Sequence, residues 1–327
     1  MLLPRRYSKH HKLPGKLHMR LLIVIAAASF ICCGKQKRIS VTKLKTHRHD
    51  LVLVTSFWAA GPDADSKSRL KANSRRREIE NAVALNVANS MIREVRIILD
   101  GFHQFYNCTT LQKRIRGKIL DVCPSSRTRL VCIERNGSQP SYFEMFNYTT
   151  DPALSGSIII LANADMVFDQ TVLRLHDLNV HTAATISTRG FGDGCEPCES
   201  IQHQLKLLGM QPLRMRSADR CYKQRPRSSW DAYVFHFNAL KFDPHGFHDD
   251  RSNEKFTMNT NGAENVALYY LKHASPNITF YQICDHVNMW HIHAAPKTHS
   301  SEIWVYGPRA IAAECASIED CLGIRGL

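Results

Sequence analysis

Residues 155–169, SGSIIILANADMVFD, combine an apolar strand with polar side chains at its end. The apolar run at 158–161 is continuous rather than alternating, which is typical of a central strand covered on both faces. Asn163, Asp165 and Asp169 follow directly. Ligands of open α/β sheets bind beyond the carboxyl ends of the strands, so these side chains are candidates for holding a divalent cation and a phosphate. A simple turn is the alternative, because Asn and Asp both bond their own backbone in turns.

The basic charge of the chain is concentrated at its N-terminal end. Of the formal net charge of +14, +11 lies in residues 1–50, which hold twelve Lys and Arg and one Asp. The rest of the chain carries only +3. Nucleic acid is therefore the partner class that the charge pattern favours least. The 327 residues and 44% hydrophobic content suffice for one large domain or two small ones, each with a real core.

The basic N-terminus brackets an apolar run at 21–33. This layout is typical of a secretory signal or a signal anchor, whose positive flank stays in the cytosol. We expect a cytosolic basic tail at 1–20, a signal anchor or signal peptide at 21–34 and a basic stem at 35–50. The run is shorter than the ~20 residues of a full span. The basic stem leaves a mitochondrial presequence as an alternative.

Glycosylation sequons and cysteines favour the secretory route. Four sequons follow the apolar run, at Asn107, Asn136, Asn147 and Asn277. Nine cysteines lie beyond Cys32 and Cys33, which fits disulfides formed in an oxidising compartment. A zinc site is the alternative for Cys195, Cys198 and Cys221, although a four-ligand spacing is missing. Cys315 and Cys321 are placed to close a small loop.

Strand and helix patterns alternate along the rest of the chain. Apolar runs and helical spacing predict strands at 51–58, 95–101, 130–133, 158–161, 183–188, 230–236, 278–284 and 289–294, and helices at 80–91, 142–148, 172–178 and 266–273. This order predicts an α/β fold with a mostly parallel central sheet and flanking helices. The ordinary dinucleotide and P-loop sites are excluded, because no Gly-x-Gly-x-x-Gly follows the first strand and no Gly-Lys-Ser/Thr loop is present.

Four pieces resemble, in their order, a GT-A glycosyltransferase: Asn163-Ala-Asp165 after an apolar strand, the strand at 228–235, Gly262-Ala-Glu-Asn265 at a helix start, and His291-Ile-His293. The resemblance covers 51–295, the expected GT-A-like catalytic domain, with a C-terminal extension at 296–327. It implies a hexosyltransferase that moves a sugar from a nucleotide-sugar donor to a glycan, protein or lipid acceptor. Many such enzymes are type II Golgi proteins, so a Golgi or ER membrane location with a lumenal catalytic domain is implied; secretion is the alternative.

The same resemblance implies a divalent metal against the donor diphosphate, usually manganese, with magnesium as the alternative. Asp165 would be its direct ligand, and Asn163 stands where many members have Asp. His291 or His293 would complete the metal shell, since imidazole, carboxylate and phosphate together suit manganese. The alternative is a pair of His on a hydrated strand face.

Glu264 matches the family's carboxylate at the start of the helix that faces the donor. It would be the base that takes the proton from the acceptor hydroxyl, with Asp231 as the second candidate. Simple stabilisation by the helix dipole is the alternative for Glu264. Arg189 is a candidate for neutralising the departing diphosphate. Thr55 and Asp100, on the first two predicted strands, are candidates for contact with the base or ribose.

Two rival functions share these residues. The first is a secretory-pathway binding protein that kept the fold and lost catalysis, which the Asn at position 163 permits. The second is a metallohydrolase that uses Asp165, His291 and His293. A hydrolase usually has more His or Asp ligands around a reactive water, which favours the transferase.

Overall fold

The computed structural model describes residues 49–58, 66–101, 106–136, 139–189, 199–210, 230–243, 246–250, 252, 254–257, 260, 262–292, 305–315 and 317–322. The expected tail, the apolar run and nearly all of the stem lie outside the described residues, as do His293 and the group of Cys195, Cys198 and Cys221. Among the helices in the described ranges, none combines the length and apolar character that crossing a membrane requires.

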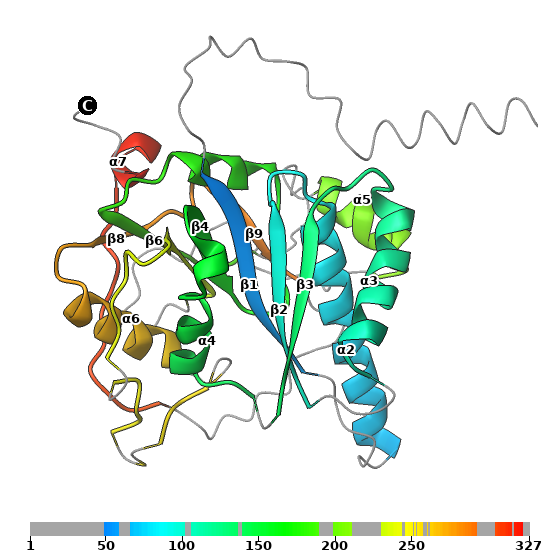
Figure 1. Ribbon diagram of the computed structural model, residues 1–327, viewed down its shortest axis with the longest axis horizontal. Coiled ribbons are helices and arrows are strands. Elements are labelled where there is room, and N and C mark those ends of the chain that lie inside the picture. Colours follow the sequence, from blue (N-terminus) through cyan, green and yellow to red (C-terminus); the bar gives the residue numbers. More distant parts are fainter. Residues whose placement is uncertain are drawn as a thin grey trace, which may run out of the picture. The chain divides into compact units, whose positions relative to one another are not determined.

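A seven-stranded sheet with the order β3-β2-β1-β4-β7-β6-β8 forms the centre of the fold (Figure 1). Its strands are β1 (Asp50–Trp58), β2 (Glu94–Asp100), β3 (Arg129–Arg135), β4 (Ser157–Ala162), β6 (Thr182–Ile186), β7 (Ala232–His236) and β8 (Thr279–Gln282). β7 pairs antiparallel with β4 and β6, whereas the other pairings are parallel. The prediction of an α/β fold with a mostly parallel sheet is confirmed.

A second, two-stranded sheet joins two segments that are far apart in the chain. β5 (Met166–Phe168) follows β4 after a short turn and pairs antiparallel with β9 (Met289–His291). Met166 lies opposite His291 in this pairing. The segment at 289–294 was predicted to end the main core, but its strand belongs to this separate ribbon and stops at His291.

Helices cover both faces of the main sheet, as the apolar run of β4 predicts. Alternate residues of β1 show the two faces: Leu51 and Leu53 pack with one helix layer, and Val52 and Val54 with the other. The first layer contains α2 (Ser66–Ala88), α3 (Cys108–Val122) and the 3-10 helix η2 (Gln170–Asp177). The second contains α4 (Tyr142–Tyr148) and α6 (Ala263–Ala274).

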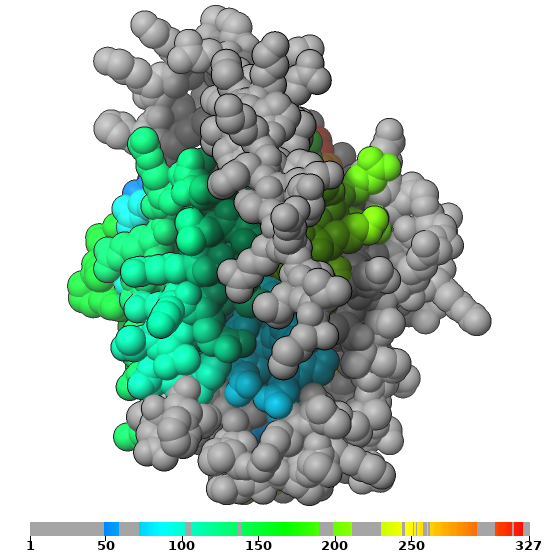
Figure 2. Space-filling model, turned by 90° about the vertical axis from the view of Figure 1, so that its right-hand side faces the viewer, coloured from blue at the N-terminus to red at the C-terminus, as the bar shows by residue number. Residues whose placement is uncertain are grey.

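An outer cluster lies behind α2 and α3. Ile201 and Leu205 of α5 (Glu199–Leu207) pack there with Trp290 of β9 and with Ala82 and Leu85 of α2. Figure 2 shows this side of the molecule, where α3 and α5 contribute much of the coloured surface. The remaining short helices are η1 (Pro152–Leu154) and α7 (Ile318–Leu322).

Two helices differ from the sequence-based expectation. α2 begins at Ser66 and ends at Ala88, rather than spanning 80–91. It ends early because the Asn89 side chain turns to bond the Phe168 carbonyl and accepts from the Met91 backbone amide. α3 was not predicted, although Asn107 caps it by accepting a hydrogen bond from Thr110 N.

Disulfides tie the periphery to the core. Cys108 at the start of α3 bonds Cys132 of β3, and Cys315 bonds Cys321 of α7. The small loop expected between Cys315 and Cys321 is therefore confirmed. Cys123 and Cys284 are disulfide-bonded as well.

Candidate functional site

The chain reverses its direction of travel across the sheet between β1 and β4. After β1 it adds β2 and β3 on one side, and it then returns to place β4 on the other side of β1. In open α/β sheets ligands bind beyond the carboxyl ends of the strands at such a switch point. The carboxyl ends of β1 and β4 are thus where a site is expected.

Polar residues next to three strands meet at this edge. Asn163 and Asp165 follow β4, and Arg189 follows β6 shortly after its end. Because β7 is antiparallel, its first residues meet the last residues of β4, with Ala232 opposite Ala162. Asp231 therefore lies at the same edge, although it precedes its strand.

Asp165 and His291 are in direct contact. His291 Nε2 lies 2.5 Å from Asp165 Oδ2, and the two side chains are only 10% and 2% exposed. The ribbon of β5 and β9 creates the contact, and the Ile292 backbone amide also donates to the Asp165 carbonyl at 3.1 Å. At this distance the carboxylate oxygen and the ring nitrogen share one proton in a hydrogen bond.

A third partner of Asp165 comes from α2. Arg75 Nη2 lies 2.7 Å from the same Asp165 Oδ2, and Arg75 Nη1 pairs with Glu78, one helical turn further along. Sequence reasoning missed Arg75, because it belongs to a run of three arginines that reads as a solvated helix face. The signal that could have found it was Glu78 three residues later, a carboxylate on the same helix face that is buried while Arg75 is partly exposed.

Asn163 and Asp231 are linked twice. Asn163 N donates to the Asp231 backbone carbonyl at 3.0 Å, and its side-chain Nδ2 donates to Asp231 Oδ1 at 3.3 Å. Thr188 Oγ1 donates to Asp231 Oδ2 at 3.1 Å. Asn163 is 5% exposed, and its Oδ1 has no hydrogen-bond partner among the described residues.

Arg189 is engaged within the protein. Its Nε and Nη2 donate to the Cys284 carbonyl at 3.3 and 3.0 Å, while its backbone carbonyl accepts from His291 N. The backbone of Arg189, just after β6, is thus hydrogen-bonded to β9. Contact with a phosphate would require the guanidinium to turn away from Cys284, and that role stays a prediction.

Glu264 lies in the first turn of α6 and is buried, although it carries a carboxylate. Tyr233 donates its hydroxyl to the Glu264 backbone carbonyl at 2.6 Å. Burial raises the pKa of Tyr233 and Tyr142 well above the usual value, and the negative charges of Glu264 and Asp231 add to this effect. Tyr233 follows Asp231 by two residues and contacts the backbone of Glu264, so this tyrosine links the segments that carry the two candidate bases.

Thr55 and Asp100 lie in β1 and β2, and no contact of either with Asp165 or His291 is seen among the described residues. Thr55 is buried in β1, and Asp100 ends β2 opposite Trp58. Arg135 Nη1 lies 3.3 Å from Asp100 Oδ1, and Arg135 also pairs with Glu144. Burial raises the pKa of Asp100 to about 6, with Arg135 acting in the opposite direction. Contact with a base or ribose stays a prediction for both residues.

The donor set at the switch point fits a divalent metal. The available ligand groups are the carboxylate of Asp165, the imidazole of His291 and the amide oxygen of Asn163. Manganese binds all three types of group, and magnesium binds the two oxygen types. A cation bound by Asp165 and His291 would replace the proton that they now share. The buried Asn163 Oδ1 accepts no hydrogen bond from the described residues. An oxygen that faces a metal would have the same surroundings.

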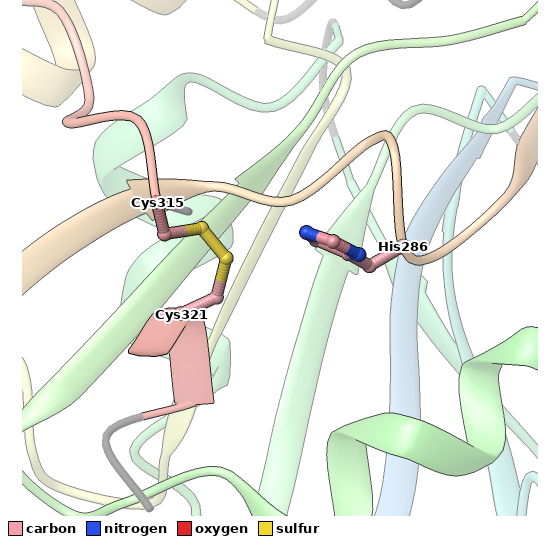
Figure 3. Close-up of side chains that lie close together, drawn as sticks. All are labelled: His286, Cys315 and Cys321. Atoms are coloured by element: carbon pink, nitrogen blue, oxygen red, sulfur yellow. A yellow bond between two sulfur atoms is a disulfide. The ribbon is translucent and has the colours of Figure 1, made fainter. Parts of the chain in front are cut away.

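Another group resembles a metal site by distance alone. Within the described residues, one group of three His, Cys, Asp or Glu side chains has ligand atoms close enough to share an ion. It consists of His286, Cys315 and Cys321. Figure 3 shows the His286 ring beside the Cys315–Cys321 disulfide. Sulfur atoms bonded to each other are not thiolates, so this group does not bind a metal in the oxidised protein.

Comparison with known proteins yields only distant structural similarity. No family model and no curated protein matches the sequence. The chain is similar to the mannosyltransferase PcManGT from Pyrobaculum calidifontis in complex with GDP-Man and Mn2+, with 11% identity, a TM-score of 0.33, and coverage of 66% of this chain and 54% of that chain. It thus spans about half the length of the mannosyltransferase.

Two further structures are similar at 11% identity. A protein from Bacillus anthracis assigned as a glucose-1-phosphate thymidylyltransferase, in complex with sucrose, has a TM-score of 0.35, with 71% of this chain and 86% of that chain covered. A UDP-glucose pyrophosphorylase complexed with UDP-glucose has a TM-score of 0.31, with 75% and 90% covered. TM-scores this low do not establish a shared fold or function.

Proposed function

We propose that this protein is a glycosyltransferase that moves a hexose from a nucleotide-sugar donor to a hydroxyl acceptor. The observation that carries the proposal is the contact of Asp165 with His291 at the switch point of the sheet. Two buried side chains of the types that bind metals, 126 residues apart in the chain, meet where open α/β sheets bind ligands. The GT-A resemblance of the motif order agrees with this placement.

Asp165 and His291 would hold a divalent metal, manganese or magnesium, with Asn163 beside them. When bound, the metal would neutralise charge on the diphosphate that departs from the sugar. The remaining ligand positions would go to phosphate oxygens and water, as is usual for cations bound by few protein groups. His293 stays a candidate for the same shell.

Glu264 would take the proton from the acceptor hydroxyl. It is buried in the first turn of α6, where Tyr233 bonds its backbone carbonyl, and Asp231 is the second candidate for the role. Asp231 has a competing structural task, since it accepts from Asn163 and Thr188. Thr55, Asp100 and Arg189 would contribute to donor binding.

The cellular setting is part of the proposal. We place the protein in the Golgi or ER membrane as a type II protein with a lumenal domain at 51–295, or in the secreted fraction if the apolar run is cleaved. The disulfide between Cys108 and Cys132 supports an oxidising compartment. The acceptor is then a glycan, protein or lipid of the secretory pathway.

A hydrolase is less well supported. Catalytic metal sites of hydrolases commonly present three protein ligands and one open position. Of the three ligands proposed for a hydrolase, Asp165 and His291 are in contact, and His293 lies outside the described residues. Two protein ligands and a bound diphosphate suit transfer from a nucleotide sugar.

A donor screen tests the proposal. Full-length protein, purified in detergent, is incubated with manganese and a panel of UDP- and GDP-linked hexoses, and released nucleoside diphosphate is measured. We expect release from at least one donor and a loss of about 100-fold or more in Asp165→Asn, by analogy with the loss of other transition-state charge stabilisers. Unchanged release in that variant, or no release and no nucleotide binding by the natural chain, would overturn the proposal. Exposed Asp121→Asn on α3 is the matched control.

A further inference from the structure

Arg75 contacts the carboxylate of Asp165, the group that would bind the metal in the proposed site. Its Nη2 lies 2.7 Å from Asp165 Oδ2, the oxygen that also accepts from His291. Its other terminal nitrogen pairs with Glu78. The carboxylates of Asp165 and Glu78 are 2% and 4% exposed, whereas the Arg75 side chain is 32% exposed. Arg75 is thus the most exposed member of an ionic cluster whose two carboxylates are buried.

The fold holds α2 in place so that Arg75 reaches Asp165. Asn86 of α2 donates to the Met166 carbonyl at 2.7 Å and accepts from Phe168 N at 3.0 Å, which makes the helix a hydrogen-bonded neighbour of β5. β5 begins directly after Asp165. The same helix therefore carries Arg75 and is bonded to the strand that positions Asp165.

A buried carboxylate without a positive partner is strongly unfavourable. Arg75 supplies that partner at Asp165 when no metal is bound. A divalent cation on the same oxygen would repel the guanidinium, because two positive charges about 3 Å apart are strongly unfavourable at low dielectric. Metal and Arg75 therefore compete for Asp165.

We propose that Arg75 exchanges places with the metal: it neutralises Asp165 in the empty protein and moves onto the donor diphosphate when the metal binds. Glu78 keeps hold of Nη1 and acts as the pivot, while Nη2 turns from carboxylate to phosphate oxygen. The planar fork of a guanidinium matches both anions. This inference rests on the proposed function and adds a phosphate-binding residue to it.

The neighbouring arginine provides a matched control. Arg76 Nη2 donates to Asn73 Oδ1 at 2.7 Å, and its guanidinium lies 4.8 Å from the centre of the Tyr106 ring. Arg76 therefore has the same charge and helix as Arg75 but its described contacts lie away from Asp165. Variants of the two residues separate a local effect from a general change in charge.

The test measures two affinities in full-length protein. Manganese binding without nucleotide is followed by electron paramagnetic resonance, and UDP and GDP binding at saturating manganese by calorimetry. In Arg75→Ala we expect tighter manganese binding, by threefold or more, and weaker binding of the preferred nucleotide by about tenfold, as for loss of one charge-assisted hydrogen bond. Arg76→Ala should change neither affinity by more than about twofold, as for other surface substitutions.

The two shifts have opposite signs, which a purely structural role of Arg75 does not produce. Arg75→Lys, which keeps the charge and loses the fork, should keep manganese affinity near that of the natural chain and still weaken nucleotide binding; this variant decides the matter if Arg75→Ala does not fold. Unchanged or weaker manganese binding in Arg75→Ala, or unchanged nucleotide binding in both variants, overturns the exchange while leaving the transferase proposal intact. If the natural chain binds neither manganese nor nucleotide, the exchange and the transferase proposal are both overturned.

Discussion

Asp165 and His291 are 126 residues apart in the chain, yet their Oδ2 and Nε2 atoms lie 2.5 Å apart. The pairing of β5 with β9 makes this contact, since Met166 stands opposite His291. A strand ribbon of only three residues on each side therefore assembles the centre of the candidate site.

Replacing His291 with Ala should weaken manganese binding by about tenfold or more, because removing an outer-shell partner alone costs 10–100-fold in metal sites and this residue is a direct ligand candidate. Manganese titration by electron paramagnetic resonance measures the effect. His273→Ala, at an exposed position near the end of α6, is the control and should bind as the natural chain does. Equal manganese affinity in both variants would remove His291 from the metal shell.

Replacing Glu264 with Gln should lower kcat by about 10²–10⁴-fold with little change in donor affinity, as for loss of a general base. Transfer to an accepted hydroxyl compound and calorimetric donor binding give the two quantities. Exposed Glu314→Gln serves as the matched control. If Glu264→Gln keeps kcat and Asp231→Asn loses it, the base is Asp231 instead.

Replacing Asn86 with Ala should destabilise the protein by about 2–4 kcal/mol, because the Met166 carbonyl and the Phe168 amide are both buried and both lose their side-chain partner. Urea unfolding followed by circular dichroism measures the loss. Asn73→Ala, at an exposed position of α2, should change stability by less than about 0.5 kcal/mol. A small effect at Asn86 would mean that α2 is held against β5 by apolar packing alone.

The pKa of Asp100 predicts how stability depends on pH. Burial raises this pKa from its usual 3.8 to about 6, so the folded protein binds the proton more tightly than the unfolded chain. The resulting stabilisation is fully present below pH ~3.8 and is lost as pH rises through ~6. A shift of this size corresponds to at most about 3 kcal/mol.

Urea unfolding at several pH values between 4 and 7.5 checks this dependence. Asp100→Asn cannot titrate, so its stability should fall less, or rise more, with pH than that of the natural chain across this window. A constant offset from the lost contact with Arg135 does not alter the comparison. Parallel curves for the two proteins would show that Asp100 keeps an ordinary pKa in the folded state.

The sequence predicted most of the sheet and part of the site. β1, β2 and β4 were found from their continuous apolar runs, and α4 was found with the bounds it has in the structure. α3 was missed, although the Asn107 cap and the spacing of Leu111 and Ile115 are helical signals. These errors concern local patterns that were present in the chain.

The errors at the site have a different origin. The motif at 163–165 indicated a ligand edge, but the local sequence does not name Asp165 as the partner of Arg75 or the Cys284 carbonyl as the partner of Arg189. A basic run on a helix has the same pattern whether it faces water or a buried carboxylate. The distinction depends on which strand the helix packs against.

By itself, the sequence determined which segments are buried and which polar side chains stand at their ends, because burial imposes a period and a composition on each segment separately. Only the tertiary structure decided that β7 runs antiparallel between β4 and β6, that β5 pairs with β9, and that Arg75 reaches Asp165. Pairing is a property of two segments together, set by the surfaces that pack and the register they adopt. A local pattern describes one of those segments and carries no information about its partner.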